Sequence, residues 1–154
     1  MKFTSYALLF LLACLGCSKS NERGASEALG FEQYKSLADS SYARKDYEGA
    51  IPYLDKLVEM DSTNALWYYR RGNSLVSITK YELAIPDLKM AISLNHRLGD
   101  SYFLLGFAYA MTTRYDSLAV ECFQKALEIN PADSTARDFL RVCQRRLADH
   151  AKSI

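Results

Sequence analysis

The apolar positions of this chain follow the spacing of helices that bury one face. Leu54 and Leu57 follow Ala50 by four and seven residues, and small or apolar residues follow Ala84 and Ala119 at the same intervals. Positions i, i+4 and i+7 lie on one side of a helix. Each such stretch is followed by a short polar break. The pattern therefore predicts an all-α protein made of amphipathic helices.

The helical pattern also repeats at a fixed interval. The phrase Tyr-Glu-x-Ala-Ile begins at Tyr47 and Tyr81, and a form with one extra residue begins at Tyr115, each 34 residues after the last. A period of this length is typical of stacked helical hairpins, because one hairpin cannot bury its apolar face without a neighbour. Such a stack offers a surface to partners, which favours an interaction protein over an enzyme.

The repeats resemble the tetratricopeptide repeat family, whose units carry an aromatic residue, a Leu-Gly pair, a Tyr, and then Ala, Phe, Ala and Pro. The third unit has the fullest match, at Leu105, Gly106, Tyr109, Ala119, Phe123, Ala126 and Pro131. The resemblance implies an α-solenoid of about three hairpins, over residues 31–64, 65–98 and 99–133. A helix over residues 134–154 resembles the capping helix that closes such arrays. Arg71 departs from the pattern, since the family has Leu there.

The amino-terminal residues 1–16 predict a signal peptide. A single charge, Lys2, precedes an apolar run from Tyr6 to Leu15. The run is too short to span a bilayer, which needs about 20 residues. An ordinary secretory signal is the alternative.

The apolar run ends at two cysteines that resemble the lipobox of bacterial lipoproteins. This resemblance implies acylation of Cys17, with a palmitate-type lipid, and Cys14 is the alternative site. Residues 17–30 then hold the lipidated cysteine and a small, polar, flexible tether. The expected location is the bacterial cell envelope, with a lipid anchor in the outer or inner membrane.

Charge and motifs exclude several function classes. The 19 Lys and Arg residues nearly balance the 18 Asp and Glu residues, whereas a nucleic-acid partner would require a strongly basic face. The two histidines, His96 and His150, have no metal-ligand spacing to each other or to cysteine. No phosphate loop, nucleophile elbow or catalytic carboxylate pair is recognisable. We therefore expect no catalytic residue, no metal and no cofactor.

Two cysteines fall in the repeat region. Cys122 lies in the second helix of the third unit and Cys143 in the capping helix. A disulfide between them is possible in an oxidising compartment, provided that the Cα atoms lie within about 7 Å. The sequence favours two buried free thiols over that bridge.

The family resemblance implies that the first helix of each unit lines a concave groove. The candidate partner-binding residues in that groove are Lys35, Tyr69, Arg70, Asn73, Phe103, Phe107 and Met111. An aromatic and aliphatic strip of this kind suits a helix or an extended peptide with apolar anchors. The alternative is that Phe103 and Phe107 only pack between helices, or are covered by the chain's own tail.

One specialised activity of the family can be tested on the sequence. Members that bind the carboxyl-terminal tails of cytosolic chaperones hold a carboxylate with Lys, Asn and Arg side chains. The corresponding positions here are Lys35, Asp39, Arg70, Asp100 and Leu104. Only Lys35 fits, and two acidic residues would repel a carboxylate, so the sequence argues against a chaperone-tail receptor.

These observations together predict a membrane-anchored protein-protein interaction module. It would act as a scaffold or adaptor in a bacterial envelope assembly and would bind a protein or peptide partner in its groove. A carrier or sensor of a small ligand or glycan in the envelope is the alternative.

Overall fold

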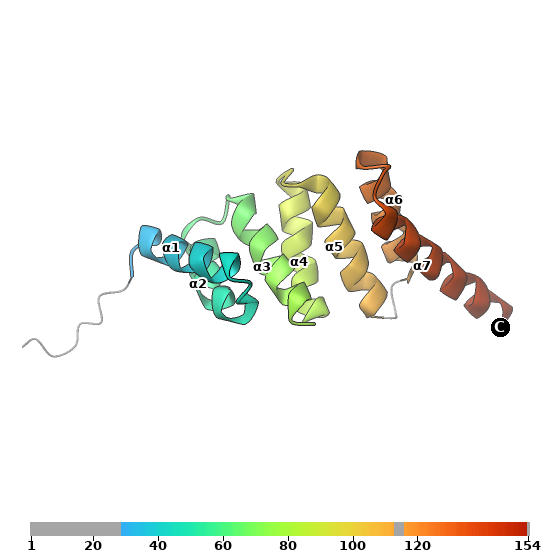
Figure 1. The fold of residues 1–154 in the computed structure, drawn as a ribbon, viewed down its shortest axis with the longest axis horizontal. Coiled ribbons are helices and arrows are strands. Elements are labelled where there is room, and N and C mark those ends of the chain that lie inside the picture. The colour runs from blue at the N-terminus through green and yellow to red at the C-terminus, as the bar shows by residue number, and fades with distance from the viewer. Residues whose placement is uncertain (1–28, 113–115, 154) are drawn as a thin grey trace, which may run out of the picture.

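The computed structural model describes residues 29–112 and 116–153 of the chain. Within them are seven helices and no strand, and the helices pack on their neighbours in chain order. The helices are α1 (Phe31–Ala43), α2 (Tyr47–Met60), α3 (Ala65–Ser77), α4 (Tyr81–Ser93), α5 (Leu98–Met111), α6 (Asp116–Ile129) and α7 (Ser134–Lys152). The hairpins follow one another along the long axis of the molecule, from α1 and α2 at one end to α6 and α7 at the other (Figure 1).

This arrangement confirms the predicted all-α solenoid of three hairpins with a further helix after the third. The i, i+4, i+7 positions of α2, α4 and α6 are buried as the periodicity requires. Their exposed fractions are at most 2% at Ala50, Leu54, Leu57, Ala84, Leu88, Ala91, Ala119, Phe123 and Ala126. Because the second helix of each hairpin is almost fully covered on this stripe, burial of the stripe holds the stack together.

The buried apolar side chains do not form one continuous core. The first hairpin has its own cluster around Leu54 and Leu57, completed by Trp67 from α3. A larger cluster runs from Leu75 in α3 to Cys143 in α7. Tyr68, Tyr69 and Ala91 form a small separate group. Each hairpin is therefore completed by the next helix in the chain, as expected of a repeat stack.

Two glycines mark the places where the helices of a hairpin approach most closely. A Cβ atom added to Gly72 would lie 2.9 Å from Cγ of Leu88, and one added to Gly106 would lie 3.1 Å from both Cβ of Cys122 and the ring of Phe123. A side chain at either position would require its neighbours to shift, and a bulky one would force the helices apart.

We expect Gly106→Leu to lower the free energy of unfolding by about 1 to 3 kcal/mol, because the added side chain overpacks the α5–α6 contact. Urea denaturation of the purified chain would measure the change. Gly99→Ala is the matched control, since a Cβ there would lie 3.4 Å from Ile129, an ordinary contact. Equal stability of the Gly106→Leu variant and the parent chain would contradict close packing at this position.

Several sequence predictions lie outside the described residues. They are the signal peptide of residues 1–16, the acylation sites Cys14 and Cys17, and most of the tether of residues 17–30. In the part of the chain that is described, no helix is both long and apolar enough to cross a membrane.

Candidate functional site

The face formed by the first helices α1, α3 and α5 carries the predicted binding residues, and we call it the first-helix face. Arg70 of α3 donates to the carboxylate of Asp39 of α1. Its guanidinium also lies over the rings of Tyr42 and Trp67, 5.3 and 5.8 Å from their centroids. Arg70 is therefore held by an ion pair and two aromatic faces, and is not a free cation awaiting a ligand.

A second polar contact joins the same two helices one turn further on. Asn73 donates from Nδ2 to the hydroxyl oxygen of Tyr42 at 2.5 Å. Lys35, also on α1, is 44% exposed, and its Nζ lies 3.8 Å from a carboxylate oxygen of Glu32. The structure thus brings Lys35, Arg70 and Asn73 to one face, and Lys35 is the most accessible of the three.

Tyr69, predicted to contact a partner, is largely buried within the chain. Its ring is 9% exposed and packs edge-on against His96 at 5.3 Å, and the Arg97 guanidinium lies 5.3 Å from its centroid. Burial raises the pKa of the Tyr69 hydroxyl. Burial and the nearby charges of Arg97 and Arg70 lower the pKa of His96. Tyr69 therefore packs against the turn between the second and third repeats, in contact with a histidine whose neutral form is favoured by burial and by the neighbouring cations.

Phe103 and Phe107 belong to an aromatic cluster that reaches the last helix. Phe139 of α7 lies 6.2 Å from Phe103 and 5.2 Å from Phe107, measured between ring centroids. Phe139 also stacks on Phe123 at 5.7 Å. Both α5 rings are only half-buried. These contacts favour inter-helix packing for Phe103 and Phe107, while Met111 at the end of α5 remains 37% exposed.

The carboxylates of the first-helix face are paired with cations. Glu32 pairs with Lys35, Asp39 with Arg70, and Asp100 with Arg97, whose Nε lies 2.8 Å from the Asp100 carboxylate. The face is consequently close to neutral. An incoming carboxylate would have to replace an existing partner, and the Lys35 pair has the longest distance of the three, 3.8 Å.

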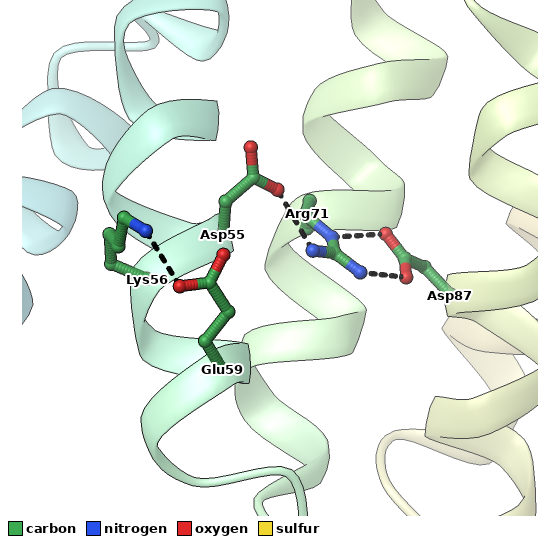
Figure 2. A network of polar contacts seen from close by, with 5 residues as sticks. All are labelled: Asp55, Lys56, Glu59, Arg71 and Asp87. Carbon is green, nitrogen blue, oxygen red and sulfur yellow. Dashed lines mark hydrogen bonds and ion pairs between the residues drawn. The ribbon is translucent and has the colours of Figure 1, made fainter.

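A charged group lies elsewhere on α3, at a residue that the sequence analysis noted only as a departure from the family pattern. Arg71 donates two hydrogen bonds to Asp87, from Nε at 2.7 Å and from Nη2 at 2.6 Å, and a third to Asp55 at 2.8 Å. Figure 2 shows Arg71 between these two carboxylates, which belong to α2 and α4. The Asp87 side chain is 6% exposed. The hydrogen bonds to Asp87 are the main cause of the raised pKa of Arg71.

The signal for this group was present in the sequence. Arg71 stands where the family has an apolar Leu, which places a cation against the core. A buried cation needs a buried anion. Asp87 directly precedes the fully buried Leu88 in α4, and it could have been recognised as that anion.

The two cysteines of the repeat region are both buried and both free. Burial raises the pKa of the Cys122 thiol to about 11, and burial also raises the pKa of Cys143. Neither thiol is an activated nucleophile, since reactive cysteines have a lowered pKa. Within the described ranges no group of His, Cys, Asp and Glu side chains could hold a metal ion.

Comparison with protein families matches residues 99–133 to the model described as a tetratricopeptide repeat. Small glutamine-rich tetratricopeptide repeat-containing protein 2 of Saccharomyces cerevisiae is 32% identical over 112 residues, covering 70% of this chain and 32% of the relative. Its counterpart in Mycosarcoma maydis is 28% identical, covering 79% and 34%. Heat shock protein STI1 of Saccharomyces cerevisiae is 27% identical, covering 73% and 19%. The chain thus spans about a third or less of these relatives.

Solved structures share the fold. The crystal structure of MamA is 28% identical with a TM-score of 0.70, covering 77% of this chain and 69% of that one. The first repeat domain of Spaghetti (RPAP3), solved with HSP90 peptide SRMEEVD, is 22% identical with a TM-score of 0.68, covering 77% and 93%. The second likeness shows the fold alone.

The predicted bacterial cell-envelope location is contradicted by these relatives. The curated proteins named above come from eukaryotes, and their similarity extends over 112 residues or more. The envelope prediction rested on the short apolar run and the cysteines within residues 1–17. A lipobox resemblance involves only a few positions, so a match across the repeats outweighs it.

Proposed function

We propose, from the premise that this chain is built of tetratricopeptide repeats, that it binds a peptide segment of a partner protein across its first-helix face. The chain would then serve as a scaffold or adaptor. Its similarity to small glutamine-rich repeat proteins and to heat shock protein STI1 supports an interaction module. The peptide-bound Spaghetti domain, which has the same fold, supports a peptide as the kind of partner.

The observation that carries the proposal is the polar bridge between α1 and α3. The pairs Asp39–Arg70 and Tyr42–Asn73 each join positions 31 residues apart, so both tie the first helix of one repeat to the first helix of the next. Side chains that are already held in place lose little freedom when a partner binds. An amide such as Asn73 has further hydrogen-bonding capacity for a peptide backbone.

The charges of this face favour a neutral or apolar peptide over an acidic tail. Arg70 is engaged by Asp39, and Asp100 stands at a position where chaperone-tail receptors have a cation. A terminal carboxylate would therefore meet two carboxylates and one accessible cation, Lys35. Leu104, partly buried, and Met111, 37% exposed, offer apolar surface for the anchors of such a peptide.

The test is a peptide array followed by fluorescence anisotropy on the tightest peptide. We expect Lys35→Glu and Met111→Asp each to weaken binding by about tenfold or more, because both residues are exposed on the proposed face. Lys125→Glu on α6 is the matched control, since Lys125 is 54% exposed and also pairs with a glutamate three residues away. It should bind as the parent chain does.

The peptide SRMEEVD serves as the acidic comparison. It should bind at least tenfold more weakly than the best neutral peptide. If SRMEEVD proves the tightest ligand, the inferred peptide chemistry is wrong. If Lys125→Glu abolishes binding while the first-helix variants keep full affinity, the first-helix face is not the site.

A further inference from the structure

A hollow of about 470 Å³ lies between α2 and α4, over the Arg71 side chain of α3. Its lining residues are Ile51, Asp55, Tyr68, Arg71, Leu75, Leu83, Pro86, Asp87 and Met90. None of them belongs to the predicted binding residues of the first-helix face. The volume is within the range of about 300 to 1,000 Å³ that is usual for binding sites. The hollow is therefore a separate candidate site.

The rim of the hollow is apolar and unusually exposed for such side chains. Leu83 is 60% exposed and Met90 is 41% exposed, both on α4. Pro86 lies between them in the sequence, and Ile51 faces them from α2. Exposed apolar side chains gathered around a concavity are a feature of interaction sites. The rim can therefore enclose an apolar side chain of a partner.

The lining of the hollow carries more negative than positive charge. The Arg71 guanidinium is occupied by its three hydrogen bonds, so it has little left to offer an anion. Asp55 is 47% exposed and contributes one oxygen to Arg71. The lining therefore holds two carboxylates against one cation. Glu59, four residues after Asp55 and 63% exposed, adds a further carboxylate nearby, although Lys56 pairs with it (Figure 2).

Pro86 adds a backbone acceptor beside the same rim. Proline has no N–H, so the carbonyl of Glu82, four residues earlier in α4, lacks its helical donor. Such a carbonyl needs a donor from water or from a partner. The excess carboxylate and this carbonyl together favour a group that donates hydrogen bonds or carries positive charge.

We propose that this hollow binds a segment of a partner protein in which an apolar side chain is flanked by lysine or arginine. The apolar side chain enters between Leu83, Met90 and Ile51. The flanking cation lies against the exposed carboxylate of Asp55. The hollow is lined by α2, α4 and the Tyr68, Arg71 and Leu75 side chains of α3. Because none of its lining residues is a predicted binding residue of the first-helix face, the two sites can be occupied independently.

Two amidated peptides would test the proposal on the full chain, one with leucine flanked by arginines and one with the same leucine flanked by glutamates. Binding is followed by ¹⁵N NMR titration. We expect the arginine peptide to shift the amide signals of Leu83 and Met90, and the glutamate peptide to bind at least fivefold more weakly. Equal binding of the two peptides, or shifts confined to α1 and α5, would overturn the proposal.

Variants at two exposed positions of the hollow complete the test. Asp55→Asn and Leu83→Asp should each weaken binding of the arginine peptide by about fivefold or more. Asp138→Asn is the control for Asp55, because Asp138 is also exposed and also faces an arginine. Lys35→Glu should leave this binding unchanged.

Analytical ultracentrifugation separates a foreign partner from a second copy of this chain. Self-association that Leu83→Asp abolishes, together with no binding of either peptide, would assign the hollow to a second copy and overturn the proposal. Binding that is unchanged in both rim variants would also overturn it.

Discussion

Replacement of Arg71 with leucine is expected to lower the free energy of unfolding by about 3 kcal/mol, although it restores the residue that the repeat family has at this position. The reason is Asp87, whose side chain is 6% exposed and has both oxygens bound by Arg71. Without Arg71 that carboxylate stays buried and loses its partner, or takes up a proton on folding. Urea denaturation near pH 7 would measure the loss.

Two further variants distinguish the loss of the buried Arg71–Asp87 pair from the loss of an arginine charge alone. Arg71→Leu combined with Asp87→Leu should recover most of the lost stability, since apolar groups of similar volume can replace a buried ion pair at little cost. Arg97→Leu should change stability by less than about 1 kcal/mol, because the Arg97–Asp100 pair is more than half exposed. A single Arg71→Leu variant as stable as the double variant would show that Asp87 does not depend on Arg71.

Phe123→Ala is expected to cost about 3 to 5 kcal/mol of unfolding free energy. The ring is 0% exposed, stacks on Phe139 of α7 and lies 5.8 Å from Phe103 of α5. Its removal would leave a cavity where three helices meet. Phe123→Leu keeps most of the volume and should lose much less. Thermal and urea unfolding would measure the stabilities of the two variants. Equal stability of both would contradict a tightly packed junction.

The same measurements on Phe107→Ala address a question that the sequence left open. If the Phe107 ring mainly packs in the core, its truncation should lower the free energy of unfolding by up to about 5 kcal/mol, whether or not a peptide is present. If the ring mainly contacts a partner, its truncation should instead reduce the affinity for the peptide selected by the array. The 5.2 Å contact with Phe139 makes the stability loss the expected result.

The fold could be predicted because its causes are local and periodic. The stripe through Ala50, Leu54 and Leu57 recurs at a fixed interval, and small residues such as Gly106 mark the helix contacts. Neither feature depends on knowing the three-dimensional arrangement. The positions of the buried side chains follow directly from the spacing.

The candidate site was harder to predict because its contacts join residues far apart in the chain. The position of Phe103 in its repeat implied a groove residue, but the contact with Phe139 depends on how α7 docks. Arg70 suggested a free cation until its pairing with Asp39 across two helices was known. The predicted cell-envelope location was wrong for a different reason, since it rested on a short stretch of residues that the repeat pattern does not constrain.

The division of the apolar core affects how local unfolding of this chain would be measured by amide hydrogen exchange. The first hairpin keeps its own cluster, which Trp67 of α3 completes, and ion pairs such as Asp39–Arg70 and Asp55–Arg71 also join it to α3. It can therefore exchange its amide protons by opening alone, at a lower free energy than global unfolding requires. A peptide laid across α1 and α3 would oppose that opening. Occupancy of the first-helix face would then be reported by slowed exchange in α2, a helix that the peptide does not touch.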